Sequence, residues 1–148
     1  MVKVDSIPPV AVYSGGVLAD TTKERNNIAR LAMHLSQADN RVVRVLVIGR
    51  TGELLAVKDG KPIPRGARPP PGELVRRASA FTVAYGAAEG ATKYLGNMQY
   101  TVLAYEGYKV MLVMMPSEDV LLSIRLPRNV HAEEIYQKVI RHWDMKAK

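Results

Sequence analysis

The residues of this chain that could bind a charged partner are mainly basic, and they are concentrated in one stretch. Residues 41–77 hold nine basic and three acidic groups, a balance of +6 out of the chain's net +7. The basic groups are Arg41, Arg44, Arg50, Lys58, Lys61, Arg65, Arg68, Arg76 and Arg77, and the acidic groups are Glu53, Asp59 and Glu73. Such a cluster attracts nucleic acid, anionic lipid or an acidic protein surface, although a solvated loop has the same composition.

Residues suited to catalysis or metal binding are sparse. The three histidines, His34, His131 and His142, fall on two predicted helices and lack the spacing of a metal site. The absence of cysteine excludes disulfides, thiolate catalysis and cysteine-based metal sites. The turns at residues 14–16 and 49–52 lack the spacing of a phosphate-binding loop. We therefore predict a non-catalytic binding module without a cofactor or metal.

A central helix is predicted over residues 73–95, with charges only near its ends. The helical spacing gives a first stripe of Leu74, Ala78, Phe81, Tyr85, Ala88, Thr92 and Leu95, and a second stripe of Ala80, Val83, Ala84, Ala87, Ala91 and Tyr94. One apolar stripe can pack on the chain's own sheet, whereas a second one in water needs another cover. We therefore predict that this helix is a self-association surface; the alternative is a helix buried by the chain's own elements.

The other elements surround this helix. A helix is predicted over residues 22–37, where Thr21 and Glu24 have the spacing of a capping box. Strands are predicted over residues 42–48, 53–58, 98–106, 108–115 and 120–126, and a last helix is capped by Asn129. The order α-β-β-α-β-β-β-α predicts an α+β fold, in which helices pack on the faces of a single five-stranded antiparallel sheet.

The chain length is that of one domain, with 148 residues of which 47% are hydrophobic. We divide it into an N-terminal arm of residues 1–21 and a domain of residues 22–148. Residues 61–72 form a basic, proline-rich loop that cannot be a helix or an inner strand. We read no signal peptide and no run long enough to span a bilayer, and so we expect a cytoplasmic protein.

Two strings carry a resemblance to a known family. The hairpin VVRVLVIGRTGELLAV precedes the small-residue helix, and the meander YTVLAYEGYKVMLVMMPSEDVLLSIRLPRNVHAEEI follows it. Together they resemble the roadblock (dynein light chain) family over about residues 22–143. The resemblance implies a roadblock/profilin-like fold and a homodimer, in which the second helices pack side by side and the third strands join the two sheets.

Carried onto this chain, the resemblance implies a set of functional residues. The dimer interface would consist of Leu74, Ala78, Phe81, Tyr85, Ala88, Thr92, Gln99, Tyr100 and Thr101. Family members typically bind small Ras-like GTPases as activators or scaffolds, and some tie cargo to motor complexes. The candidates for contacting such a partner are Arg50, Arg65, Arg68, Arg76 and Arg77. The N-terminal arm and the basic loop are not typical of a minimal family member.

Two other functions fit the same sequence. A basic nucleic-acid-binding module would use residues 41–77, but this stretch has no aromatic residue on which a base could stack. Its binding would depend on phosphate contacts and would weaken steeply with salt. A longin-like or profilin-like adaptor has a similar element order, and the uncharged central helix favours the roadblock interpretation because it predicts dimerisation.

Overall fold

An antiparallel sheet of seven strands organises the chain, in the spatial order β2-β1-β4-β3-β7-β6-β5. The computed structural model describes residues 11–14, 17–18, 23–60 and 69–147. The strands are β1 (Ala11–Ser14), β2 (Val17–Leu18), β3 (Arg44–Ile48), β4 (Leu54–Asp59), β5 (Thr101–Ala104), β6 (Tyr108–Met115) and β7 (Val120–Pro127). The central strands β3 and β7 are rich in β-branched and leucine side chains, which suit a strand buried on both faces.

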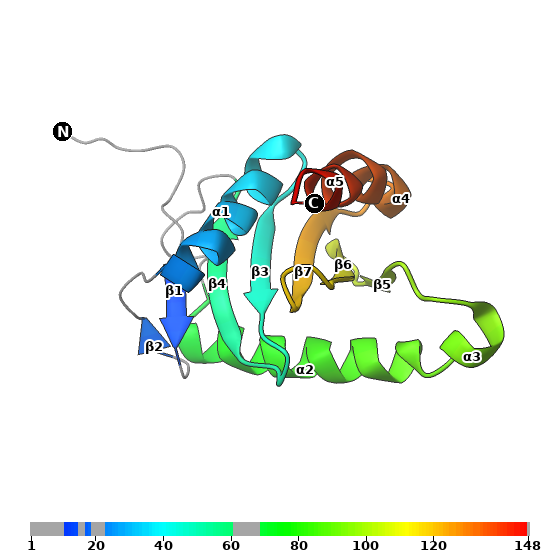
Figure 1. Ribbon diagram of the computed structural model, residues 1–148, viewed down its shortest axis with the longest axis horizontal. Helices are drawn as coiled ribbons and strands as arrows, with labels where there is room; N and C mark the ends of the chain where they lie inside the picture. Colours follow the sequence, from blue (N-terminus) through cyan, green and yellow to red (C-terminus); the bar gives the residue numbers. More distant parts are fainter. Residues whose placement is uncertain (1–10, 15–16, 19–22, 61–68, 148) are drawn as a thin grey trace.

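The helices form layers on both faces of this sheet (Figure 1). They are α1 (Lys23–Ala38), α2 (Pro71–Glu89), α3 (Thr92–Leu95), α4 (Ala132–Ile135), the π-helical segment η2 (Tyr136–Ile140) and α5 (Arg141–Ala147). Helix α1 and the α4-η2-α5 segment pack on one face, over a core that includes Met111, Leu122 and Ile124. Helix α2 packs on the other face, over Leu46 and Leu112.

The structure confirms the predicted α+β fold and the predicted order of elements from the first helix onward. The five predicted strands correspond to β4-β3-β7-β6-β5, and they pair antiparallel as expected. The N-terminal arm adds to this sheet, because β1 pairs with β4 at Ala11 and Val12, and β2 pairs with β1. Thr21 of the predicted capping box and residues 61–68 of the basic loop lie outside the described residues.

Three predicted helix boundaries differ from the structure. Helix α2 begins at Pro71, so the last two residues of the predicted 61–72 loop are helical, since proline is tolerated in the first turn of a helix. The helix predicted over residues 73–95 is interrupted, because α2 ends at Glu89 and the short α3 begins at Thr92. Gly96 then ends α3 with a φ of 89°, a conformation that glycine adopts without steric cost. Asn129 does not cap the last helix: it lies in the turn closed by the Val130 N–H donating to the Pro127 carbonyl, and the N-cap residue is His131.

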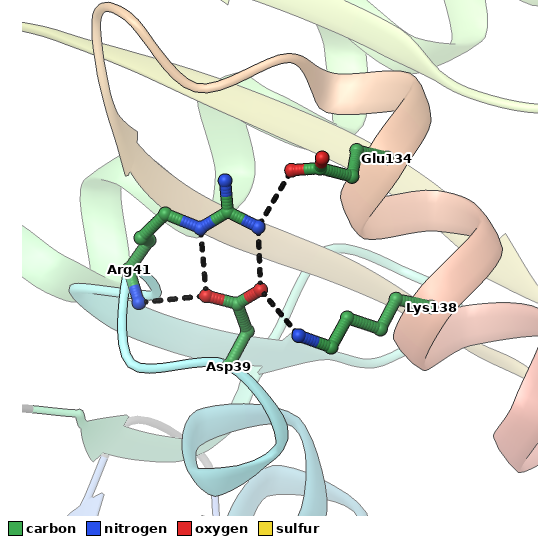
Figure 2. A network of polar contacts seen from close by, with 4 residues as sticks. All are labelled: Asp39, Arg41, Glu134 and Lys138. Atoms are coloured by element: carbon green, nitrogen blue, oxygen red, sulfur yellow. Dashed lines mark hydrogen bonds and ion pairs between the residues drawn. The ribbon is translucent and has the colours of Figure 1, made fainter.

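A buried carboxylate joins the end of α1 to the C-terminal helical segment (Figure 2). The Asp39 side chain is 3% exposed, and its Oδ1 accepts from the Arg41 backbone N–H at 2.8 Å and from Arg41 Nε at 2.9 Å. Its Oδ2 accepts from Arg41 Nη2 at 2.7 Å and from Lys138 Nζ at 3.3 Å. Arg41 Nη2 also lies 2.6 Å from Glu134 Oε1. These donors, first among them the Arg41 side chain, lower the pKa of Asp39 well below its ordinary value.

We expect Asp39→Asn to lower the free energy of unfolding by about 2–4 kcal/mol at pH 7, because it leaves Arg41 and Lys138 without their buried anion. A lowered folded-state pKa stabilises the fold above the unfolded-state pKa, and this stabilisation is lost as the pH falls through the folded-state value. The deficit of the variant should therefore shrink between pH 5 and strongly acid pH. Urea unfolding across this pH range measures it.

The matched control is Glu134→Gln, since the Glu134 side chain in the same network is 53% exposed. This exposed ion pair should contribute no more than about 1 kcal/mol. Equal losses for the two variants would contradict the central role of the buried carboxylate.

Candidate partner-binding surface

The first stripe of α2 is largely buried by the chain's own sheet. Leu74, Ala78, Phe81 and Tyr85 are between 0% and 9% exposed and belong to the core under α2. Four residues of the dimer interface that the resemblance implies therefore lie in the chain's own core. The stripe leaves the core at Ala88, which is exposed, and at Thr92, which is half-buried and donates from Oγ1 to the Glu89 carbonyl at 2.7 Å.

The second stripe of α2 is the uncovered one. Val83 is 72% exposed, Ala80 and Ala87 are exposed, and Ala84 is half-buried. A side chain built at Gly86 would meet no atom within 4 Å. Because Leu74, Ala78, Phe81 and Tyr85 take the helix face that points into the sheet, the residues about half a turn away point outward. The result is an apolar helix face made of small side chains and one valine.

The apolar surface continues from α2 onto neighbouring elements. Tyr94 and Leu95 on α3 are each 83% exposed. Strand β5 is at the end of the sheet and pairs with β6 alone among the described strands, so its outer edge carries unpaired backbone groups. Figure 1 shows α2 running on beyond β5, with α3 at its far end. The described chain therefore has two uncovered features, an apolar helix face on α2 and the outer edge of β5.

The three predicted residues before and in β5 have different surroundings. Gln99 is exposed, and Thr101 begins β5 and is half-buried. The Tyr100 hydroxyl donates to Glu133 Oε1 at 2.6 Å, and its ring lies 5.3 Å from the Tyr136 ring. Tyr100 therefore attaches the start of β5 to the C-terminal helical segment, and it is held by the chain itself.

Among the basic groups of residues 41–77 that the structure describes, several are buried or already paired with a carboxylate. Arg44 and Lys58 are buried, and Arg44 Nε donates to Asp59 Oδ1 at 2.6 Å. Arg76 and Arg77 share Glu73, at 2.6 Å and 3.2 Å. Among the predicted partner-binding residues that the structure describes, Arg50 has the most exposed side chain, at 80%, and its Nε is 3.4 Å from Asp119 Oδ1. Arg65, Arg68 and Lys61 lie outside the described residues.

His34 and His142 lie in an aromatic cluster between α1 and α5. The His34 ring on α1 lies 5.0 Å from the Trp143 ring and 6.2 Å from the His142 ring on α5. Within the described residues, no group of three or more potential ligands could hold a metal ion. In the same part of the chain, no helix combines the length and the apolar character that a membrane span requires.

Two further residues, not predicted from the sequence, are brought beside Arg44 by the fold. Arg125 on β7 lies directly opposite Arg44 across the β3-β7 pair, and the Arg125 guanidinium stacks 4.2 Å from the centroid of the Tyr108 ring on β6. The available signal was an arginine inside each of two apolar strands, VVRVLVI and LLSIRLP. A charged group flanked by buried positions usually has a specific partner or function.

Comparisons with known proteins identify the fold. No family model matches this sequence, and no curated protein matches it. Among solved structures, MglB in a tetrameric arrangement has a TM-score of 0.63 and 20% sequence identity, and the match covers 95% of this chain and 94% of that chain. The gliding protein MglB from Thermus thermophilus has a TM-score of 0.60 and 19% identity, covering 95% of this chain and 93% of that chain.

A Roadblock/LC7 domain from Streptomyces avermitilis has a TM-score of 0.57 and 13% identity, and the match covers 78% of this chain and 96% of that domain. These likenesses agree with the predicted resemblance. The chain has the roadblock fold, and β1 and β2 of its N-terminal arm extend the sheet beyond β4.

The burial of the first stripe predicts different responses at Phe81, in its buried part, and at Leu95, at its exposed end. Phe81→Ala should lower the free energy of unfolding by about 3–5 kcal/mol, because it leaves a cavity between α2 and the sheet. Leu95→Ala should change it by less than about 0.5 kcal/mol, because Leu95 has little contact to lose. Chemical unfolding of both variants checks this. A large loss at Leu95 would instead mean that this end of the stripe is also covered, by the chain itself or by a second copy.

Proposed function

We propose that this chain is a non-catalytic homodimeric scaffold or regulator that binds a small Ras-like GTPase. The observation that carries the proposal is the second stripe of α2, an apolar helix face that is exposed over about two turns from Ala80 to Ala87. The outer edge of β5, which no described strand pairs, is a second uncovered feature. Each feature is unfavourable in an isolated chain, because water contacts apolar surface and the edge invites uncontrolled pairing. A second copy of the same chain covers both.

The chemistry of the exposed face suits a helix as its partner. Ala80, Ala87 and Gly86 have little or no side chain, so a second backbone can approach closely at these positions. Gly86 costs about 1 kcal/mol relative to alanine within a helix, and close packing against a second helix offsets this cost. The 19 residues of α2 extend over about 28 Å, which is long enough to form most of a stable interface when a strand edge adds to it.

The GTPase partner is suggested by the fold together with the surface. Proteins of the resembled family typically bind small Ras-like GTPases, and the chain shares their fold over most of its length. A regulator of this kind acts by arranging the GTPase's own catalytic residues, and an arginine supplied in trans is a second route. Arg50, exposed in the β3-β4 turn, is the described residue that we propose for an ionic contact with the partner.

A nucleic-acid-binding function has less support from the described residues. Arg44 and Lys58 are buried, and Arg41, Arg76 and Arg77 already have carboxylate partners. Phosphate contacts need accessible cations, and binding through them weakens steeply as salt is added.

We expect Val83→Glu to convert a dimer into a folded monomer. The substitution places a charge at the centre of the proposed interface, where burying it without a partner is costly. In the single chain Val83 is exposed, so circular dichroism should stay native while the mass measured by light scattering halves. Gln37→Glu adds the same charge at an exposed position of α1 and should remain dimeric. A wild-type mass of one chain at micromolar concentration would reject the dimer.

We expect wild-type protein to bind a small Ras-like GTPase of the same organism in a nucleotide-dependent way. Surface-immobilised protein can be titrated with the GTPase loaded with GDP or with a non-hydrolysable GTP analogue. Arg50→Glu should weaken binding about tenfold. The glutamate would face the acidic groups of the GTPase that Arg50 is proposed to contact, and this repulsion would mainly slow association. Arg141→Glu, on the helical layer across the sheet from α2, is the control. Equal losses for both variants would show that only net charge matters.

A further inference from the structure

A cavity of about 420 Å³ lies between α2 and strands β3, β7 and β6. Its walls combine apolar residues, among them Leu74 and Phe81, with the arginines Arg44, Arg77 and Arg125. Tyr105 and Tyr108, whose side chains are exposed, also line it, so the cavity is accessible from solvent. This volume is within the usual range for small-molecule sites, which are apolar clefts with a few well-placed polar groups.

Arg44 is the residue that most needs an additional partner. Its side chain is 4% exposed, and its Nε donates to Asp59 Oδ1 at 2.6 Å. Its Nη1 is buried and has no hydrogen-bond partner within the part of the chain that the structure describes. A buried N–H group of a charged side chain without an acceptor is costly and is rare in native proteins. An acceptor bound in the cavity would satisfy it.

Arg125, the second arginine of the cavity, adds a positive charge that a bound anion would balance. The Cα atoms of Arg44 and Arg125 are partners across the β3-β7 ladder, an arrangement in which like charges destabilise a sheet. Arg125 stacks 4.2 Å from the Tyr108 ring centroid and forms no ion pair with a carboxylate of the described chain. Burial, followed by the charge of Arg44, lowers the pKa of Arg125. The guanidinium nevertheless stays protonated at neutral pH.

The other cations near the cavity differ in how they are balanced. Asp59 compensates Arg44 on one side, and Glu73 is shared by Arg76 and Arg77 on α2. The cavity region thus has four guanidinium groups, those of Arg44, Arg76, Arg77 and Arg125, although Arg76 does not line the cavity. The carboxylates of Asp59 and Glu73 balance two of them, so the region keeps an excess of positive charge. Planar guanidinium groups bind carboxylate and phosphate oxygens in bidentate fashion, which selects an anion with two or more oxygens.

We propose that this cavity binds a small organic anion, with a carboxylate or phosphate group held by Arg44 and Arg125 and an apolar body lying against Leu74 and Phe81. The buried, unsatisfied Arg44 Nη1 accounts for the head group, and the apolar wall of α2 accounts for the body. The site does not depend on the proposed GTPase function. It lies beside the proposed dimer surface and shares Ala80 with it.

The proposal is tested by calorimetric titration of the full chain with four probes. Phenyl phosphate and phenylacetate carry both the head group and the body, inorganic phosphate carries the head group alone, and benzyl alcohol carries a body without charge. We expect one of the first two to bind at one site per chain at least about tenfold more tightly than either fragment, because burial of the ring adds to the ionic contact. The tighter of the two identifies the head group.

Two methionine variants make the test specific. Arg125→Met removes the head-group contact while keeping the volume of the side chain, and it should weaken binding about tenfold or more. Arg76→Met removes an arginine that donates to Glu73 but does not line the cavity. The affinity of this variant for the probes should stay within about twofold of wild type. Circular dichroism verifies that both variants are folded.

Several results would overturn the proposal. One is the absence of saturable binding by wild-type protein for phenyl phosphate and phenylacetate alike. Another is an equal loss of affinity in the two methionine variants, which would indicate a general charge effect. A change in the mass of Arg125→Met by light scattering, without a change in ligand affinity, would assign the cavity to contact between copies of the chain.

Discussion

Among the described elements, α2 is the only long helix on one face of this sheet, and it is too narrow to cover that face completely. An α-helix with its side chains is about 10 Å across, whereas seven strands about 4.8 Å apart form a much wider sheet. On the opposite face, α1 and the C-terminal helical segment together bury Met111, Leu122 and Ile124 completely. On its own face, α2 protects only a band of the sheet, so Leu103 and Met114 stay half-buried beside it.

The two apolar stripes of α2 have different surroundings. The first stripe supplies the core from Leu74 to Tyr85, and the second stripe around Val83 contacts water. A polar outer face would suffice for a monomer, so the apolar character of the second stripe has no explanation within the described residues of the single chain. The incomplete cover leaves the cavity at the flank of α2, where Arg44 and Arg125 meet on neighbouring strands. The cavity is therefore a consequence of the incomplete cover, whereas the apolar second stripe is a separate feature of α2.

Much of the fold was predictable because its signals are local. The strands follow from β-branched runs such as residues 42–48, and the bounds of β6 agree with the prediction to the residue. Periodicity identified both stripes of α2, but it could not tell which one meets the sheet, because that depends on residues distant in sequence. The break after Glu89 was missed because the stripes continue through it in sequence. Arg44 and Arg125 are neighbours only because β3 pairs with β7, a long-range pairing that the spacing does not reveal.

The cavity and the second stripe are close enough to influence each other through Ala80, which belongs to both. A second α2 packed against Ala80 would narrow the opening beside Arg77, and a ligand protruding from the cavity would contact that second helix. Binding free energies are reciprocal, so if a ligand favours the dimer, dimer formation strengthens binding of the ligand by the same factor. Arg125 lies on β7, away from the helix face, and Val83 lies on the helix, away from the cavity lining. Substitutions at these two positions therefore separate ligand binding from dimerisation, and the double variant measures the coupling between them.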